Sequence, residues 1–270
     1  MKPSILHLLF AVSLLFCYST PSFSQDFEVA PVLVSFDANP GESQSRRLTV
    51  RNHSNEIQRY LFTLADYIVN EQGARQSVDA GSTDRSLESL LTVNPSFVEL
   101  NPNETAEVDL NIDVPQGWFK TCWGIVHVEV AREQTAVDAD RQMATGILIQ
   151  PRINVLVSQS SRANQNYSGT VRGLQEVTVP GNPRRSFEAT LINTGDKILK
   201  AKVFLAIANM NTAEEQLFDP SNITVYPGQE RAVTLTLPVM PEPGSYALAF
   251  MMDYGRRAAV EGAQILLEVE

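Results

Sequence analysis

Histidines are the side chains most often used as catalytic bases, and this chain has few of them. Beyond residue 24 only His53 and His127 remain: the first lies in a polar turn, and the second alternates with valines. A histidine base needs a nucleophile and an orienting group beside it. The sequence has no Gly-x-Ser-x-Gly, His-Glu-x-x-His or phosphate-loop motif that would supply them. We therefore predict that the protein is not an enzyme.

Metal and thiol chemistry have equally little support in the sequence. Asp138 and Asp140 lie near Glu133, but a calcium loop supplies more oxygen ligands at fixed spacing. Cys122 has no second cysteine or adjacent histidine at a useful spacing, so we expect an unreactive thiol. We predict no metal site and no cofactor.

Three aromatic residues gather where the chain turns into a predicted strand. Trp123 is expected in a sandwich core, where such a tryptophan is common. Trp118 and Phe119 suit a core equally well as an exposed platform for a peptide or sugar, because large aromatic side chains serve both purposes. Both interpretations of this pair stay open.

The N-terminus has the order of a signal peptide. Lys2 precedes an apolar run over residues 5–16, and small Ser22 and Ser24 stand at the third-last and last positions before the expected cleavage. The run is too short to span a bilayer, although a retained anchor is the alternative. We predict a signal peptide over residues 1–24 and an exported mature chain without an integral membrane segment. The periplasm is the expected compartment, with an extracellular or cell-surface location as the alternative.

The charge balance narrows the class of partner. The formal net charge is −10, and no basic cluster interrupts the acidic chain. Nucleic acid and anionic membranes attract basic surfaces, so we exclude both as targets.

The remainder of the sequence has the pattern of an all-β protein. β-branched and alternating segments follow one another closely, with Asn, Gly, Pro and Ser turns between them, as in antiparallel sandwiches. One short helical turn is expected in a loop, capped by Thr83 and Asp84. The clearest predicted strands are residues 47–52, 57–67, 106–114, 124–131 and 145–157.

A loose internal repeat indicates two similar domains. Residues 48–55 and 189–196 are both strands that run into a polar turn after an asparagine, Asn52 or Asn193. Later in each half, a proline turn leads into another alternating strand. Two copies of one strand order predict two tandem immunoglobulin-like β-sandwich domains. We place them at residues 26–157 and 167–270, with an exposed linker over residues 158–166.

The first half of the chain also contains a series of strand and turn motifs. They are Phe36-Asp37, Pro40-Gly41-Glu42, Leu48–Asn52, Asp66-Tyr67, Asn70–Gly73, Phe97–Pro102 and Val114-Pro115. In these motifs it resembles the N-terminal domain of periplasmic pilus chaperones and that of WxL-interacting proteins of cell surfaces. The resemblance implies an immunoglobulin fold that binds another protein, and motifs of this kind specify fold better than function.

The sequence departs from the chaperone pattern at two of the positions that bind the partner. Pilus chaperones hold a subunit's C-terminal carboxylate with basic residues in the first and last strands of this domain. Here the segment 29–36 has no basic residue, and Asn154 stands at the lysine position of the last strand. Arg152 is therefore the one basic residue of the chaperone pattern that this sequence retains for binding a carboxylate.

The segment 145–157 is the predicted binding element. Pro151 interrupts its alternating apolar row, and proline within a sheet favours an edge strand, which can pair with an extended partner. The alternative is that the row only fills the core. We predict a chaperone-like assembly factor that engages a secreted or surface protein through this edge. The alternative function is a structural scaffold that binds peptidoglycan or a surface protein complex. The candidate binding residues are Ile147, Ile149, Arg152, Ile153, Asn154, Val155, Val157, Trp118 and Phe119.

Overall fold

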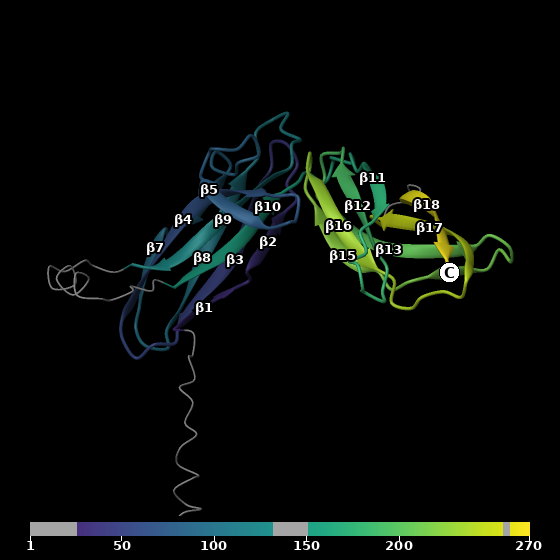
Figure 1. Ribbon diagram of the computed structural model, residues 1–270. Coiled ribbons are helices and arrows are strands. Elements are labelled where there is room, and N and C mark those ends of the chain that lie inside the picture. The colour runs from purple at the N-terminus through teal and green to yellow at the C-terminus, as the bar shows by residue number, and fades with distance from the viewer. Residues whose placement is uncertain (1–25, 132–150, 256–259) are drawn as a thin grey trace, which may run out of the picture.

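The computed structural model describes residues 26–131, 151–255 and 260–270. The chain forms two β-sandwiches, which meet at one end with their long axes inclined to each other (Figure 1). The described residues contain strands and turns and no helix. The prediction of two tandem immunoglobulin-like domains in an all-β chain is confirmed.

The first domain packs a four-stranded sheet against a six-stranded one. The smaller sheet has the order β1 (Phe27–Ala30), β3 (Ser43–Asn52), β8 (Thr105–Asp113), β6 (Leu91–Asn94). The larger sheet has the order β2 (Leu33–Phe36), β10 (Arg152–Gln159), β9 (Cys122–Val130), β4 (Gln58–Val69), β5 (Arg75–Asp79), and β7 (Phe97–Leu100) also pairs with β4.

The first strand of this domain changes sheets. β1 pairs with β3, and β2 pairs in parallel with β10 in the opposite sheet. Pro31 lies between β1 and β2 and lacks the N–H that a continued ladder requires. The chain therefore crosses from one sheet to the other at this point.

The second domain has a three-stranded and a five-stranded sheet. The smaller sheet has the order β11 (Gly169–Glu176), β12 (Ser186–Asn193), β16 (Glu230–Thr236). The larger has the order β14 (Glu215–Leu217), β13 (Leu199–Asn209), β17 (Gly244–Asp253), β18 (Glu261–Val269), and β15 (Ser221–Val225) also pairs with β13.

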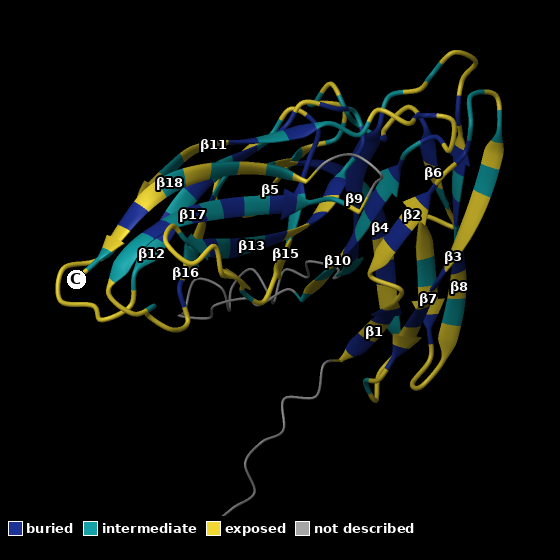
Figure 2. Cartoon of the chain, turned by 90° about the vertical axis from the view of Figure 1, so that its right-hand side faces the viewer, coloured by how far each residue is buried: buried dark blue, intermediate teal, exposed yellow. Residues whose placement is uncertain are grey.

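Alternating side chains fill each sandwich, as the bands of buried and exposed residues in Figure 2 show. β9 is the exception, because all but one of its residues are buried. Val126 and Val128 face the core of the first domain, whereas Trp123 and Ile125 belong to a separate cluster on the outer face of the sheet. Other elements must therefore cover that outer face, and the functional site lies among them.

Two local expectations do not hold. The segment after Thr83 forms turns and no helix, because the Thr83 and Ser86 hydroxyls donate to the Asp66 carboxylate at 2.9 and 2.7 Å. The linker was expected to be exposed. However, β10 continues into it as far as Gln159, and Ser161 is also buried, with 1% of its surface exposed.

Candidate functional site

One side of β10 is fully paired, and the other side is paired along only part of the strand. Along its whole length it pairs with β9 in antiparallel register. On its other side, β2 covers Leu156–Gln159, and the Leu156 N–H donates to the Val32 carbonyl at 2.9 Å. No described strand lies beside Arg152–Val155 on that side. Since N–H and C=O groups alternate along a strand, those of Arg152 and Asn154 point the same way as those of Leu156, toward the open side.

The side chains of β10 divide between the core and the outer face. Val155 and Val157 are fully buried in the core of the first domain, and Ile153 packs against that core. A partner would therefore meet their backbone before their side chains. Ile147 and Ile149 lie outside the described residues, so their part in binding stays a prediction.

Two outward-facing residues of β10 have partners within the sheet. Arg152 forms an ion pair with Glu129 of β9 at 2.8 Å. Asn154 Oδ1 lies 2.7 Å from His127 Nδ1, and His127 Nε2 lies 3.1 Å from the Ser77 hydroxyl oxygen. Ser77, His127 and Asn154 come from three strands, and sequence reasoning missed their contact because they are far apart in the chain. The chain of hydrogen bonds ties β5 across the outer face of the sheet to the open edge strand.

Trp118 and Phe119 lie in different surroundings, and their part in binding stays a prediction. Trp118 packs against the core of the first domain, while Phe119 is 50% exposed. Trp123 is buried as predicted, but against Tyr226 of the second domain, with ring centroids 5.0 Å apart. The neighbouring Cys122 is also buried, which raises the pKa of its thiol and favours the protonated, unreactive form.

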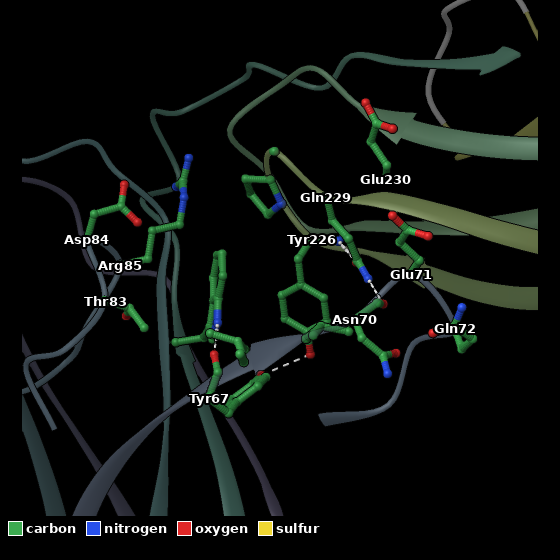
Figure 3. A pocket seen from close by; sticks show the side chains of 15 residues that line it. Tyr67, Asn70, Glu71, Gln72, Thr83, Asp84, Arg85, Tyr226, Gln229 and Glu230 are labelled. Carbon is green, nitrogen blue, oxygen red and sulfur yellow. Dashed lines mark hydrogen bonds between the residues drawn. The ribbon is translucent and has the colours of Figure 1, made fainter. Parts of the chain in front are cut away.

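The junction between the domains is built on this aromatic cluster (Figure 3). The Tyr67 and Tyr226 hydroxyl oxygens lie 2.9 Å apart, and the Trp123 indole N–H donates to the Tyr67 carbonyl at 3.1 Å. Burial raises the pKa of Tyr67, so its hydroxyl stays protonated at neutral pH. A cavity of about 610 Å³ lies beside the cluster, bordered by Arg85 and Glu230.

One carboxylate joins several elements at the junction. Asp196 of the second domain accepts from Arg85 at 2.6 Å, from the Thr121 N–H at 3.0 Å and from the Asn164 amide at 2.7 Å. The Arg85 guanidinium also lies over the Trp123 ring, 5.5 Å from its centroid. These contacts fix the second domain against the first.

The β4–β5 hairpin makes a further set of contacts with the second domain. The Ala232 N–H donates to the Glu71 carbonyl at 3.0 Å. Gly73 has a φ of 83°, and a Cβ there would lie 2.5 Å from the Arg231 guanidinium. A side chain at position 73 would therefore strain the turn and push Arg231 away.

A cationic cleft lies between β2 and β10 of the first domain and β13 and β15 of the second. Its cavity measures about 280 Å³, and Leu33, Leu156 and Tyr226 form part of its apolar wall. Arg75, Lys197 and Lys200 also line it. Lys197 donates to the Ser161 carbonyl at 2.7 Å, whereas Lys200 has no ion pair within the described part of the chain. Sequence reasoning missed these cations, because they come from β5 and from the second domain.

Comparisons with known proteins agree with this architecture. A chain of a chaperone–tip adhesin complex of CFA/I fimbriae biogenesis is similar over 90% of this chain and 98% of its own, with 15% identity and a TM-score of 0.50. The class 5 fimbriae chaperone CfaA is 14% identical over 90% of this chain and 99% of its own, with a TM-score of 0.48. The CsuC–CsuE pre-assembly complex of Acinetobacter baumannii contains a chain that is 12% identical over 80% of this chain and 91% of its own, with a TM-score of 0.42.

No protein-family model and no curated protein matches the sequence. In the described residues, no helix has the length and apolar character needed to cross a membrane. The resemblance to pilus chaperones is confirmed at the level of the fold, and the resemblance to WxL-interacting proteins stays a prediction. The chain has the two-domain immunoglobulin-like fold of fimbrial chaperones.

Proposed function

We propose that the protein is a non-catalytic assembly factor of the periplasm that binds another exported protein by strand addition. The observation that carries the proposal is the open side of β10 at Arg152–Val155, next to the segment that β2 covers. An extended segment placed there would pair with the backbone groups of Arg152 and Asn154, beside which no described strand lies. The fold shared with fimbrial chaperones supports this function, and an extracellular location is the alternative.

A segment bound along the open side of β10 would run toward the cationic cleft. Val32 and Leu33 stand at the start of β2, where the open side ends, and they are 47% and 68% exposed. A partner strand in line with β2 would meet these apolar side chains at its tip. Beyond them, Arg75 and Lys200 offer positive charge to a carboxylate, a task for which Arg152 is less suited because Glu129 engages it.

A proline substitution tests strand addition directly. Asn154→Pro removes the N–H that faces the open side and is tolerated by an unpaired edge. Asn154→Ala is the matched control, because it loses the side chain and keeps the N–H. We expect Asn154→Pro to lose capture of envelope proteins in a pull-down, while Asn154→Ala retains it. Equal capture by a folded Asn154→Pro variant, checked by circular dichroism, would refute binding at this edge.

The absence of catalysis is a separate part of the proposal. Ser77, His127 and Asn154 have the order of a nucleophile, a base and an orienting group, but neither Ser77 nor His127 lines the three cavities at the junction, the cleft and the β13–β14 hairpin. We expect no labelling by a serine-reactive fluorophosphonate under conditions that label a serine esterase. Labelling that disappears in both Ser77→Ala and His127→Gln would show that this part of the proposal is wrong.

A further inference from the structure

The central part of the outer face of the five-stranded sheet in the second domain is largely apolar. Side chains of β13 and β17 that point away from the core are paired across the two strands. Ala206 lies opposite Ala249, Ala208 opposite Ala247, and Phe204 opposite Met251. A sheet face turned to water normally carries polar residues. This face therefore has the composition of a buried surface.

Two exposed leucines extend this apolar surface to the neighbouring strands. Leu217 of β14 lies opposite Ala206 and is 69% exposed, and Leu266 of β18 lies opposite Ala247 and is 74% exposed. We call the surface of Ala206, Ala208, Leu217, Ala247, Ala249 and Leu266 the alanine face. Contiguous exposed apolar patches mark interaction sites.

Opposite charges flank the alanine face along the strand direction. Lys200 and Lys202 of β13 point outward at the end near the first domain, with Asp253 of β17 opposite Lys202, so this end has a net positive charge. Glu215 of β14 lies at the other end, opposite Ala208. Neither Lys202 nor Glu215 makes an ion pair with another described residue. A surface with a cation at one end and an anion at the other is complementary to its own copy turned end to end.

We propose that the alanine face is the contact surface of a homodimer. A second copy packs sheet to sheet about a two-fold axis that runs across the strands. This rotation reverses the strand direction, so Lys202 of each subunit approaches Glu215 of the partner subunit, and the pair forms twice. The small alanine side chains allow the two sheets to approach closely, and the leucines cover the sides of the contact.

The size of the face sets the strength of the association. Four strands at about 4.8 Å and six to seven residues at about 3.3 Å give roughly 400 Å² per subunit. Stable complexes bury about 800 Å² per partner, so the dimer is weak and forms in a concentration-dependent equilibrium. The open side of β10 lies in the first domain and stays available in this arrangement.

Sedimentation velocity of the purified protein at increasing concentration tests the proposal. We expect a monomer–dimer equilibrium, and we expect Ala249→Lys to remain monomeric because it places two charges against each other in an apolar contact. Thr190→Lys, on the outer face of β12, is the matched control and should dimerise like the wild type. A wild-type protein that stays monomeric, or an Ala249→Lys variant that dimerises normally, overturns the proposal. Loss of the dimer in Thr190→Lys as well would contradict the assigned surface.

A charge exchange tests the orientation and avoids any effect on folding in the centre of the sheet. Lys202→Glu and Glu215→Lys should each weaken the dimer, and the double variant should restore it. Failure of the double variant to recover would overturn the two-fold arrangement. Because Asn154→Pro leaves this face untouched, loss of partner capture and loss of dimerisation are separable results.

Discussion

The two domains share a buried asparagine at the same corner of the sandwich. Asn52 donates to the carbonyls of Glu56 and Leu100 at 2.8 and 3.1 Å. Asn193 donates to the carbonyls of Lys197 and Val225 at 2.8 and 2.9 Å. In both domains the side-chain oxygen accepts a backbone N–H two residues later. The internal repeat in the sequence is thus a repeat of one hydrogen-bonded turn.

The surroundings of the two corners differ. The Asn52 corner lies at the free end of the first domain, where the next residues are polar and exposed. The Asn193 corner lies at the junction, where Asp196 binds two groups of the first domain and one of the linker. The residue three positions after each asparagine is Asn55 in the first domain and Asp196 in the second. One turn therefore serves as a structural corner in one domain and as a docking element in the other.

The strongest test of this comparison removes the asparagines themselves. Asn193→Ala leaves two buried carbonyls without a donor, at about 1–3 kcal/mol each, so we expect a loss of about 3 kcal/mol in the free energy of unfolding. Asn52→Ala should cost a similar amount in the first domain alone. Urea unfolding measures both, with exposed Asn55→Ala as a control that changes stability by less than about 0.5 kcal/mol. If either variant lost less than about 1 kcal/mol in the free energy of unfolding, the two asparagines would not have equivalent structural roles.

A smaller effect is expected from the residue that distinguishes the corners. Asp196→Asn leaves the half-buried Arg85 without its counter-ion, which should cost about 2 kcal/mol and loosen the junction. Faster proteolysis within residues 160–166 and a larger radius of gyration in X-ray scattering would report the loosening. The matched change Asn55→Asp should alter neither quantity. An unchanged radius and cleavage rate in Asp196→Asn would show that the aromatic cluster and the hairpin contacts hold the domains without this ion pair.

The third prediction concerns a buried tyrosine of the first domain, whose removal should change stability least at neutral pH. Burial raises the pKa of Tyr60 in the first domain to about 12, and its hydroxyl is buried without a hydrogen-bond partner among the described residues. A raised pKa in the folded state means that stability is retained below the ordinary value of about 10 and is lost as pH rises toward 12.

Alkaline denaturation should therefore begin in the first domain. Tyr60→Phe should be close to neutral at pH 7, because the hydroxyl it removes is unsatisfied, and it should reduce the loss of stability between about pH 10 and pH 12. Near-ultraviolet circular dichroism at rising pH measures this. An identical alkaline transition in wild type and Tyr60→Phe would exclude Tyr60 as its cause.

Local patterns predicted much of the fold and little of the site. Asn52 and Asn193 mark turns that short-range hydrogen bonds specify, so the two domains were visible in the sequence. The inward face of β10 followed from alternation, and Val155 is buried accordingly. The Thr83 turn was misjudged as helical because the hydroxyls bind Asp66, which is distant in sequence.

The site depends on contacts that no local pattern encodes. Trp123 was expected in a sandwich core, but the second domain supplies its neighbour Tyr226. Ser77 reaches His127 only because the hairpin of β4 and β5 lies across the sheet. Which part of β10 is open depends on where the first strand changes sheets, a property of the whole domain.

The change of sheets at Pro31 also bears on solubility at high concentration. Unpaired edges invite edge-to-edge aggregation, and proteins limit this danger with short edges and charged side chains. The open side of β10 is confined to Arg152–Val155 in the described chain, with an arginine and an asparagine facing outward. The arginine and the asparagine on this part of the edge disfavour pairing with a second copy. Under the proposed strand addition, the crossing leaves this opening for a partner strand, while the outward polar side chains disfavour self-polymerisation.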